Sequence, residues 1–470
     1  MITRGSEQQY IELYEQARQM ISDHSSEVMN AVRDEAFERF VSSGFPSKKV
    51  ERYKYTDIQK LFAPDYGLNL NRLTIPVDPY NAFRCDVPNL STSLYFVVND
   101  MFYRSEKDSQ RHTLLSREEA RDERIPHASA KLPEGVIVSS LKELSSNSSP
   151  LTSHLYNKLA GKANDAVTDL NTMLAQDGLY VYVPKNVKVD RAIQVINILR
   201  SDVDLMVNRR VLIVLEEGAE LKMLFCDHAA DDKNFLTTQV IEAYVGENAS
   251  LDLYCLEETH HKNVRVSNVY IDQQRDSRVN HNVITLHNGV TRNRLDLTFS
   301  GEGAECQCYG CVIADKQQHV DNNTLITHKV PHCTSNELYK YVLDDKAVGA
   351  FAGRVLVEHG AQKTTSQMTN QNLTATKEAR MFTQPMLEIY ADDVKCAHGS
   401  TVGQLNDAAL FYMRQRGISL EDAKVLLQNA FINEVIDKMQ LEPLRDRLHY
   451  LVEKRFMGEL NKCKGCQLCK

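Results

Sequence analysis

The chain has 470 residues, of which 42% are hydrophobic and 25% are charged, and its formal net charge is −8. This composition is ordinary for a globular protein with a large core, and the acidic balance argues against a general nucleic-acid-binding protein. The N-terminus is too polar for a signal peptide, and no apolar run approaches the roughly 18 residues of a membrane span. We therefore expect a cytoplasmic protein whose 11 cysteines are mostly free thiols.

The first 150 residues predict a helical and mixed region. Apolar residues at helical spacing between Gln8 and Val41 predict two helices, which Gly44 and Pro46 bring to an end. A strand-like run follows at residues 94–98. The serine-rich stretch that ends at residue 150 predicts a domain boundary.

From about Gly178 the sequence changes to short β-type runs that small residues interrupt every 27 to 30 positions. A repeat of 20–50 residues built from short strands is typical of a stacked solenoid, and this one is too short to contain a crossover helix. We therefore predict a mainly β protein with a parallel β-helix over residues 151–404; chance spacing in a β-sandwich is the alternative. The aligned positions are Ala192, Ala219, Ala249, Ser277, Ala304, Thr334 and Ala361.

Residues 405–457 are predicted to be helical again. Asn406 can cap a helix that ends at Gly417, and Ser419 with Asp422 forms a capping-box pair in front of a second helix. A last helix is expected from about residue 443 to residue 456. The apolar stripes of these helices favour either a core or a docking surface for a partner.

The segment DDVKCAHGSTVGQL, at residues 392–405, places Cys396 and His398 two positions apart. In a strand both side chains lie on the same face. Thiolate and imidazole are the ligand pair suited to zinc or iron–sulfur chemistry. Two ligands are half of a four-coordinate site, so the others must come from elsewhere in the fold or from another chain.

This segment, with the LFYMRQRGI that follows it, resembles the SufB/SufD family of the SUF iron–sulfur cluster assembly system. The likeness extends upstream through THKVPHCTSNELYKYVLDD and GEGAEC to PSKKVERYKYTDI, where the family usually has Trp at the position of Tyr53. It covers most of the chain from about Phe45 to Met439. The order Lys-Cys-Ala-His-Gly favours the SufD type over the sister scaffold SufB.

The resemblance implies a right-handed parallel β-helix flanked by N-terminal and C-terminal helical regions. It also implies a SufBCD complex, in which a SufD-like chain pairs with SufB through the β-helices and binds the SufC ATPase through its C-terminal helices. His398 matches a residue regarded in the family as a ligand of the nascent iron–sulfur cluster, opposite a SufB cysteine. Cys396 matches the neighbouring family cysteine, whose role is less clear.

A cysteine-rich tail occupies residues 458–470, with Cys463, Cys466 and Cys469 at C-x2-C-x2-C spacing. This repeats the first three cysteines of a ferredoxin-type run without the fourth. Neighbouring lysines favour thiolate formation. The tail is therefore a candidate metal or sulfur site, with a flexible tail of unused thiols as the alternative; the family resemblance lends it no role.

Three other groups have metal-binding or catalytic residue types, and a structural reading is favoured for each. The cysteines of GAECQCYGC can fill the narrow solenoid, the histidines and cysteine of THKVPHC can lie in its wall, and the paired aspartates of DDVK are typical backbone acceptors before a turn. These residues are Cys306, Cys308 and Cys311, then His328, His332 and Cys333, and finally Asp392 and Asp393.

No P-loop and no dinucleotide fingerprint occurs in the sequence, so no nucleotide site is expected on this chain. We predict a non-enzymatic scaffold subunit without catalytic residues, whose only cofactor is a transient iron–sulfur cluster, and no nucleic-acid or membrane partner. The alternatives are a SufB-type scaffold or a homodimer that stands in for both subunits. A β-helix enzyme acting on carbohydrate is less favoured, because the chain offers Cys and His rather than a surface of carboxylates.

Overall fold

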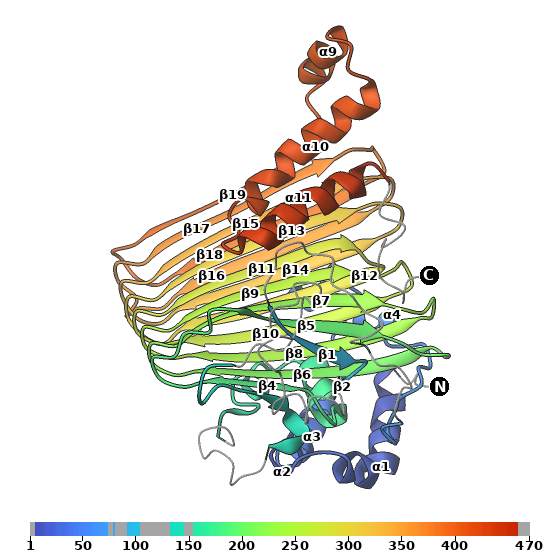
Figure 1. The fold of residues 1–470 in the computed structure, drawn as a ribbon, viewed down its shortest axis with the longest axis vertical. Helices are drawn as coiled ribbons and strands as arrows, with labels where there is room; N and C mark the ends of the chain where they lie inside the picture. The colour runs from blue at the N-terminus through green and yellow to red at the C-terminus, as the bar shows by residue number, and fades with distance from the viewer. Residues whose placement is uncertain (1–4, 74–78, 80–91, 104–131, 145–153, 459–470) are drawn as a thin grey trace, which may run out of the picture.

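The computed structural model describes residues 5–73, 79, 92–103, 132–144 and 154–458. The strands form two β-sheets that face one another, and from β4 onward consecutive strands alternate between the two (Figure 1). All strand pairs from β4 to β19 are parallel. The structure thus confirms the predicted β-solenoid between two helical regions; its right-handedness stays a prediction.

The ten-stranded sheet has the order β19-β17-β15-β13-β11-β9-β7-β5-β1-β2, and the nine-stranded sheet has the order β18-β16-β14-β12-β10-β8-β6-β4-β3. The strands of the first sheet are β1 (Thr92–Val98), β2 (Met101–Tyr103), β5 (Ala192–Leu199), β7 (Glu220–Ala229), β9 (Ser250–Glu258), β11 (Arg278–His287), β13 (Glu305–Ala314), β15 (Thr334–Leu343), β17 (Thr365–Thr374) and β19 (Lys395–Gly403). Those of the second sheet are β3 (Ile137–Ser140), β4 (Leu179–Val183), β6 (Leu205–Leu215), β8 (Phe235–Val245), β10 (Val264–Gln273), β12 (Val290–Phe299), β14 (His319–His328), β16 (Val348–Val357) and β18 (Arg380–Ile389).

Small residues before the strands of the ten-stranded sheet stack on one another, as the repeat predicted. Glu220, Ser250, Arg278 and Glu305 pair in register, so the residues that precede them form one column at the turn. The predicted Thr334 and Ala361 are wrong by one and three positions. Their places in the column belong to Cys333 and Thr364, and the turn before β17, residues 358–364, is longer than the turn before β15, residues 329–333. Ala192 is also wrong, since it lies inside β5 rather than at that turn.

The N-terminal region covers one end of the solenoid, at the bottom of Figure 1. Three helices form where two were predicted, because Ser26 accepts a hydrogen bond from the backbone N–H of Met29 and starts a separate short helix. Every residue of α8 is buried, and α8 packs against α3 and β8. The helical elements here are α1 (Glu7–Asp23), α2 (Glu27–Asn30), α3 (Arg33–Ser43), η1 (Glu51–Tyr53), α4 (Ile58–Leu61), η3 (Leu141–Glu143), η4 (Ala160–Lys162) and α8 (Ala166–Leu174).

Tyr53 anchors the N-terminal segment to the outer face of the nine-stranded sheet. The guanidinium carbon of Arg292, on β12, lies 4.1 Å from the centre of its ring, and its hydroxyl donates to Asp165. Asp165 in turn caps α8 through the backbone N–H of Thr168 and pairs with Arg294 at 2.7 Å. One buried carboxylate therefore joins the segment, the helix and the sheet.

The C-terminal helices are α9 (Asp407–Gln415), α10 (Leu420–Ile436) and α11 (Glu442–Phe456), with Asn406 and Ser419 as the predicted N-caps. The apolar faces of α11 and of the second half of α10 cover the ten-stranded sheet. Lys340 of β15 strengthens this contact, because its buried ammonium group donates to the carbonyl oxygen of Phe431 at 3.0 Å and pairs with Glu434. By contrast, α9 has no buried residue and projects beyond the last coil (Figure 1).

A fully buried ion pair holds the segment before α8 to the solenoid. Arg210 of β6 and Glu242 of β8 are 2.7 Å apart, and the same carboxylate accepts the backbone N–H groups of Asn157, Leu159 and Ala160. Replacing Glu242 by Gln leaves the guanidinium uncompensated, so we expect a loss of about 3–5 kcal/mol in stability. Thermal unfolding followed by circular dichroism measures it.

The exposed pair Lys185–Glu217 has the same 2.7 Å separation and is the matched control. Glu217→Gln is expected to leave the unfolding temperature unchanged, because solvent screens an exposed pair. Equal shifts for the two substitutions would contradict the structural role assigned to Glu242.

Candidate cluster-ligand site at the open end of the solenoid

The last coil of the solenoid ends in two edge strands. Within the described parts of the chain, β19 pairs only with β17 and β18 only with β16. The residues of β18 and β19 are half-buried or exposed, whereas the inward-facing positions of earlier strands are buried. The helices and strands of the N-terminal region cover the opposite end, so the β18–β19 end is the open one.

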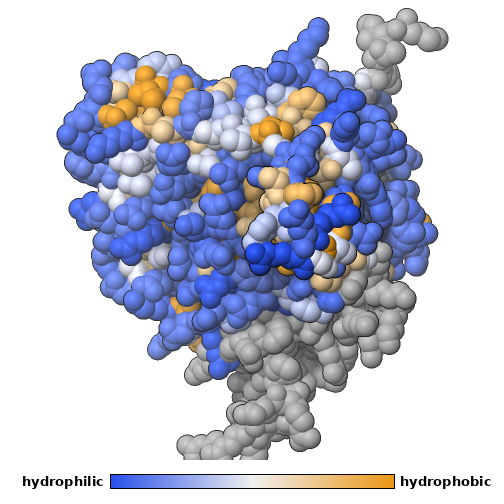
Figure 2. Space-filling model, turned by 90° about the horizontal axis from the view of Figure 1, so that it is seen from above, coloured by the Kyte–Doolittle hydropathy of each residue, from blue (hydrophilic) through white to orange (hydrophobic). Residues whose placement is uncertain are grey.

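The open end carries apolar as well as polar surface. Phe382 and Ile389 on β18 and Val402 on β19 are about 40 to 50% exposed. Figure 2 views the molecule from this side and shows hydrophobic surface interrupted by hydrophilic residues. Exposed apolar surface beside unpaired strand edges is typical of a surface that another chain covers.

Cys396 and His398 both lie on β19 and face the same side, as predicted. Their register partners on β17 are Ser366 and Met368, which are buried inside the solenoid. The thiol and the imidazole therefore point toward the interior space, or lumen, between the two sheets. They remain accessible because no further coil covers them: Cys396 is half-buried and His398 is exposed.

His398 is the last member of a column of inward-facing residues. In-register pairing stacks Leu253, His281, Cys308, Glu337, Met368 and His398 on successive strands of one sheet. All members except His398 are buried. The position of β19 at the end of the stack thus leaves an inward-facing residue, His398, accessible at the surface.

Partial burial raises the pKa of the Cys396 thiol, and a hydrogen bond with the backbone of Ser366 opposes this effect. The thiol is therefore neutral at pH 7, and a metal ion would have to displace its proton. Among the residues that the structure describes, no group of three or more His, Cys, Asp or Glu side chains could hold a metal ion. Among the described residues, the predicted pair consequently remains half a site.

A polar contact between the two sheets lies next to His398 and was not predicted. The hydroxyl oxygens of Thr383, on β18, and Ser400, on β19, are 2.6 Å apart. Ser400 also donates to the amide oxygen of Asn370 on β17. These bonds hold the last two strands together beside the candidate ligands. The sequence signal was the alternation in CAHGS, which places Ser400 on the face of Cys396 and His398.

The central cysteines have structural positions. Cys306 and Cys308 are buried in the solenoid interior, as predicted, whereas Cys311 faces outward beneath α10 and α11. The expectation that all three fill the solenoid is thus corrected, because residue 311 has the opposite parity on β13. Burial raises the pKa of Cys311 to about 12, and burial with a hydrogen bond to Cys306 raises that of Cys308.

The other candidate groups do not converge on the open end. His328 is buried and lies 2.9 Å from the Ser335 hydroxyl, Cys333 is buried, and His332 is an exposed turn residue. The backbone of Asp393 bonds with Lys363 and with the Gln362 side chain, whereas its carboxylate pairs with the Lys363 ammonium group rather than making the backbone bonds that the sequence predicted. The predicted tail site, Cys463, Cys466 and Cys469, lies outside the described residues. None of the described helices is long and apolar enough to cross a membrane.

The environment of Cys396 predicts a distinct reactivity. The other six cysteines that the structure describes are buried, so Cys396 should be the first of the seven to be alkylated in the native protein. Only the thiolate reacts, and the pKa of Cys396 is raised from 9.0, so the rate should still be rising above pH 9. Peptide mapping by mass spectrometry after timed iodoacetamide treatment measures it. Equal native-state labelling of Cys306 or Cys308 would be inconsistent with the solenoid packing.

The sequence matches one protein family along most of its length. Residues 198–431 match the family described as "SUF system FeS cluster assembly, SufBD core domain", and residues 4–195 match "SufBD protein N-terminal region". Over 460 residues the chain is 28% identical to an iron–sulfur cluster assembly SufBD family protein of Synechocystis, with 94% of each chain covered.

Two bacterial relatives are named SufD. The Escherichia coli protein is 36% identical over 173 residues, which cover 37% of this chain and 41% of the relative. The Bacillus subtilis protein is 25% identical over 324 residues, which cover 68% and 74%. Together with the solenoid and the Cys-Ala-His strand at its open end, these matches show that the chain is a SufD-like member of the SufBD family of SUF iron–sulfur cluster assembly proteins.

Proposed function

We propose that this chain is a non-enzymatic scaffold subunit that presents His398 and Cys396 to a nascent iron–sulfur cluster shared with a SufB-like partner. The observation that supports this most is the open end, where an accessible imidazole and thiol face the same side of an edge strand. Two ligands cannot complete a four-coordinate site, and a partner chain would supply the rest. The cluster is the cargo of this reaction rather than a resident cofactor.

The open end favours a second β-solenoid as the partner. Solenoids need capping elements because their terminal coils expose both core residues and unpaired backbone groups. A SufB-like solenoid placed end to end would pair with β19 or β18 and cover Phe382 and Val402. A second copy of this chain would present the same kind of open end, with exposed apolar residues and unpaired strand edges. A homodimer is therefore the alternative in the absence of SufB.

Shared ligation fits a cluster that must be released. A site with four thiolates from one rigid chain would hold its cluster permanently, whereas mixed nitrogen and sulfur ligands from two chains separate when the chains move apart. Movement of the two chains relative to one another would change how tightly the interface holds the cluster, because the joined and separated states differ in their affinity for it. His398 would act as a ligand of moderate strength on one side of that interface.

The C-terminal helices favour a SufC-type ATPase as a second partner. Phe411 and Tyr412 on α9 are 65% and 55% exposed, and Leu426 on α10 is half exposed. These side chains lie on the part that projects beyond the coils, while Lys340 and the apolar face of α11 hold the other part to the sheet (Figure 1). Because this chain has no phosphate-binding loop, the partner would supply ATP hydrolysis.

Replacing His398 by Ala tests the ligand role. In a complex reconstituted with SufB-like and SufC-like subunits, we expect cluster build-up to fall about tenfold or more, since loss of a ligand costs at least as much as loss of a supporting contact. Iron and sulfide are measured on the purified complex. Size-exclusion chromatography should show the same complex as the unchanged protein.

The matched control is His359→Ala, which removes an exposed histidine of the turn after β16. It should leave the iron and sulfide content unchanged. A normal cluster yield with His398→Ala would refute the ligand role, and loss of the complex itself would show that His398 acts in assembly instead.

Replacing Phe411 by Ala tests the ATPase-docking surface. Truncation of a central aromatic residue at an interface costs about 2 kcal/mol or more, which corresponds to a roughly 30-fold weaker affinity for the SufC-like subunit. Isothermal titration calorimetry with the isolated chain measures it. Tyr450→Ala on α11, where the side chain is 48% exposed, is the control and should bind normally. Equal weakening by both would place the docking surface elsewhere.

A further inference from the structure

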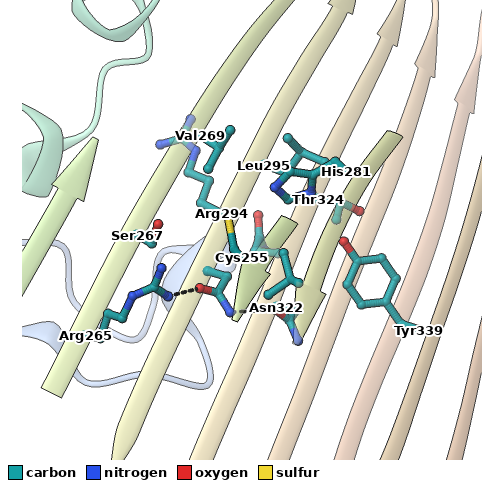
Figure 3. A pocket seen from close by; sticks show the side chains of 13 residues that line it. Cys255, Arg265, Ser267, Val269, His281, Arg294, Leu295, Asn322, Thr324 and Tyr339 are labelled. Atoms are coloured by element: carbon teal, nitrogen blue, oxygen red, sulfur yellow. Dashed lines mark hydrogen bonds between the residues drawn. The ribbon is translucent and has the colours of Figure 1, made fainter. Parts of the chain in front are cut away.

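The lumen of the solenoid holds several polar side chains among apolar ones around its middle coils. A cavity there is lined by inward-facing side chains from both sheets, among them Cys255, Arg265, Ser267, His281 and Asn293 (Figure 3). The space open to the centre of a water molecule is about 10 Å³. That is close to the smallest space that holds one ordered water.

Strand register places these polar residues together. Ser267, Asn293 and Asn322 pair on β10, β12 and β14 and face inward, while His281 faces them from β11 of the other sheet. A solenoid that needed only apolar contact would place aliphatic residues here, as it does at Val279 and Leu297. The polar lining is therefore a local feature of these coils.

His281 lacks hydrogen-bond partners within the described residues. Its side chain is buried, and neither the Nδ1 nor the Nε2 atom has a partner there. Burial lowers its pKa to about 4, so the ring is neutral at pH 7 and carries one N–H donor and one acceptor. Buried polar atoms are almost always satisfied, because leaving them unpaired costs the hydration they lost.

Several polar residues that line the cavity with His281 are engaged with one another. The Arg265 guanidinium pairs with Asp227 at 2.9 Å and donates to Asn293 at 2.8 Å. Asn293 then donates to the side-chain oxygen of Asn322 at 2.9 Å, and Asn322 donates to the Tyr341 hydroxyl. This series of hydrogen bonds runs along the cavity wall and does not include the imidazole. The ring is therefore free to bond with a molecule inside the cavity.

A second cavity of the same size lies nearer the N-terminal end of the lumen, beside Arg209 and Gln239. Arg209 pairs with Asp227 at 2.7 Å and donates through Nε to the carbonyl oxygen of Asn99, but its Nη2 atom has no partner among the described residues. Asp227 therefore joins the two guanidinium groups that border the two cavities. The same pattern, an unpaired buried polar atom beside a water-sized space, occurs twice in one lumen.

We propose that these cavities are internal hydration sites, and that His281 binds an ordered water molecule in the cavity of the middle coils. Water fits because it can either accept from the ring N–H or donate to the unprotonated ring nitrogen, whichever of the two faces the cavity. An anion fits poorly, since Asp227 already balances Arg265 and His281 is uncharged. A metal ion fits poorly too, since the described residues bring no three ligands together.

Magnetic relaxation dispersion of water oxygen-17 counts long-lived internal waters, and it tests the proposal on the full-length chain. We expect His281→Leu to reduce that count by at least one. His261→Leu, which removes an exposed histidine of the turn between β9 and β10, should leave it unchanged. An equal count for His281→Leu and the unchanged protein would overturn the proposal.

Crystallography of the unchanged protein gives a second test that does not depend on the variant folding. A density peak within hydrogen-bonding distance of a His281 ring nitrogen, with the scattering of oxygen, supports the proposal. An empty cavity, or a peak with anomalous scattering from an ion, refutes it. The unfolding temperature of His281→Leu distinguishes the same two cases. Removing an imidazole without any hydrogen-bond partner would raise the unfolding temperature, whereas removing an imidazole that binds a water molecule would not.

Discussion

The structure depends on in-register stacking of parallel strands. Each coil adds one strand to each sheet, and equivalent residues of successive coils fall directly above one another because the backbone hydrogen bonds between strands join neighbouring coils. The alternation of side chains then divides each strand into residues that face the lumen and residues that face outward. Each inward-facing residue therefore belongs to a column of residues that stack on successive strands. Every such column ends at the last coil.

The candidate ligand residues lie where the stack of coils ends. A column from Leu253 to Met368 is shielded by the coil that follows, whereas His398 has no coil above it. Because no described coil follows, the outer backbone edges of β18 and β19 have no strand partner among the described residues. One geometric fact, the absence of a described coil beyond β18 and β19, thus accounts for the accessible Cys396 and His398 side chains and for the exposed apolar surface beside them.

Buried charge is used elsewhere to attach the non-repeating parts to the repeats. Glu242 holds the segment before α8, Asp165 holds the N-terminal segment around Tyr53, and Lys340 holds α10. Each charged group is paired and also bonds to other polar groups, which offsets the cost of its burial. In the lumen, His281 differs from these groups because neither of its ring nitrogens has a protein partner among the described residues.

The amino-acid pattern alone determined the repeat, the helix caps at Asn406 and Ser419, and the shared face of Cys396 and His398. These are local properties that follow from side-chain alternation and capping chemistry. It missed the displacement of Ala361, the outward position of Cys311 and the Thr383–Ser400 contact, because turn lengths vary between coils and contacts between sheets join distant residues. Only the tertiary structure decided which strand is last and which polar residues meet in the lumen, since both depend on how the coils stack rather than on any one segment.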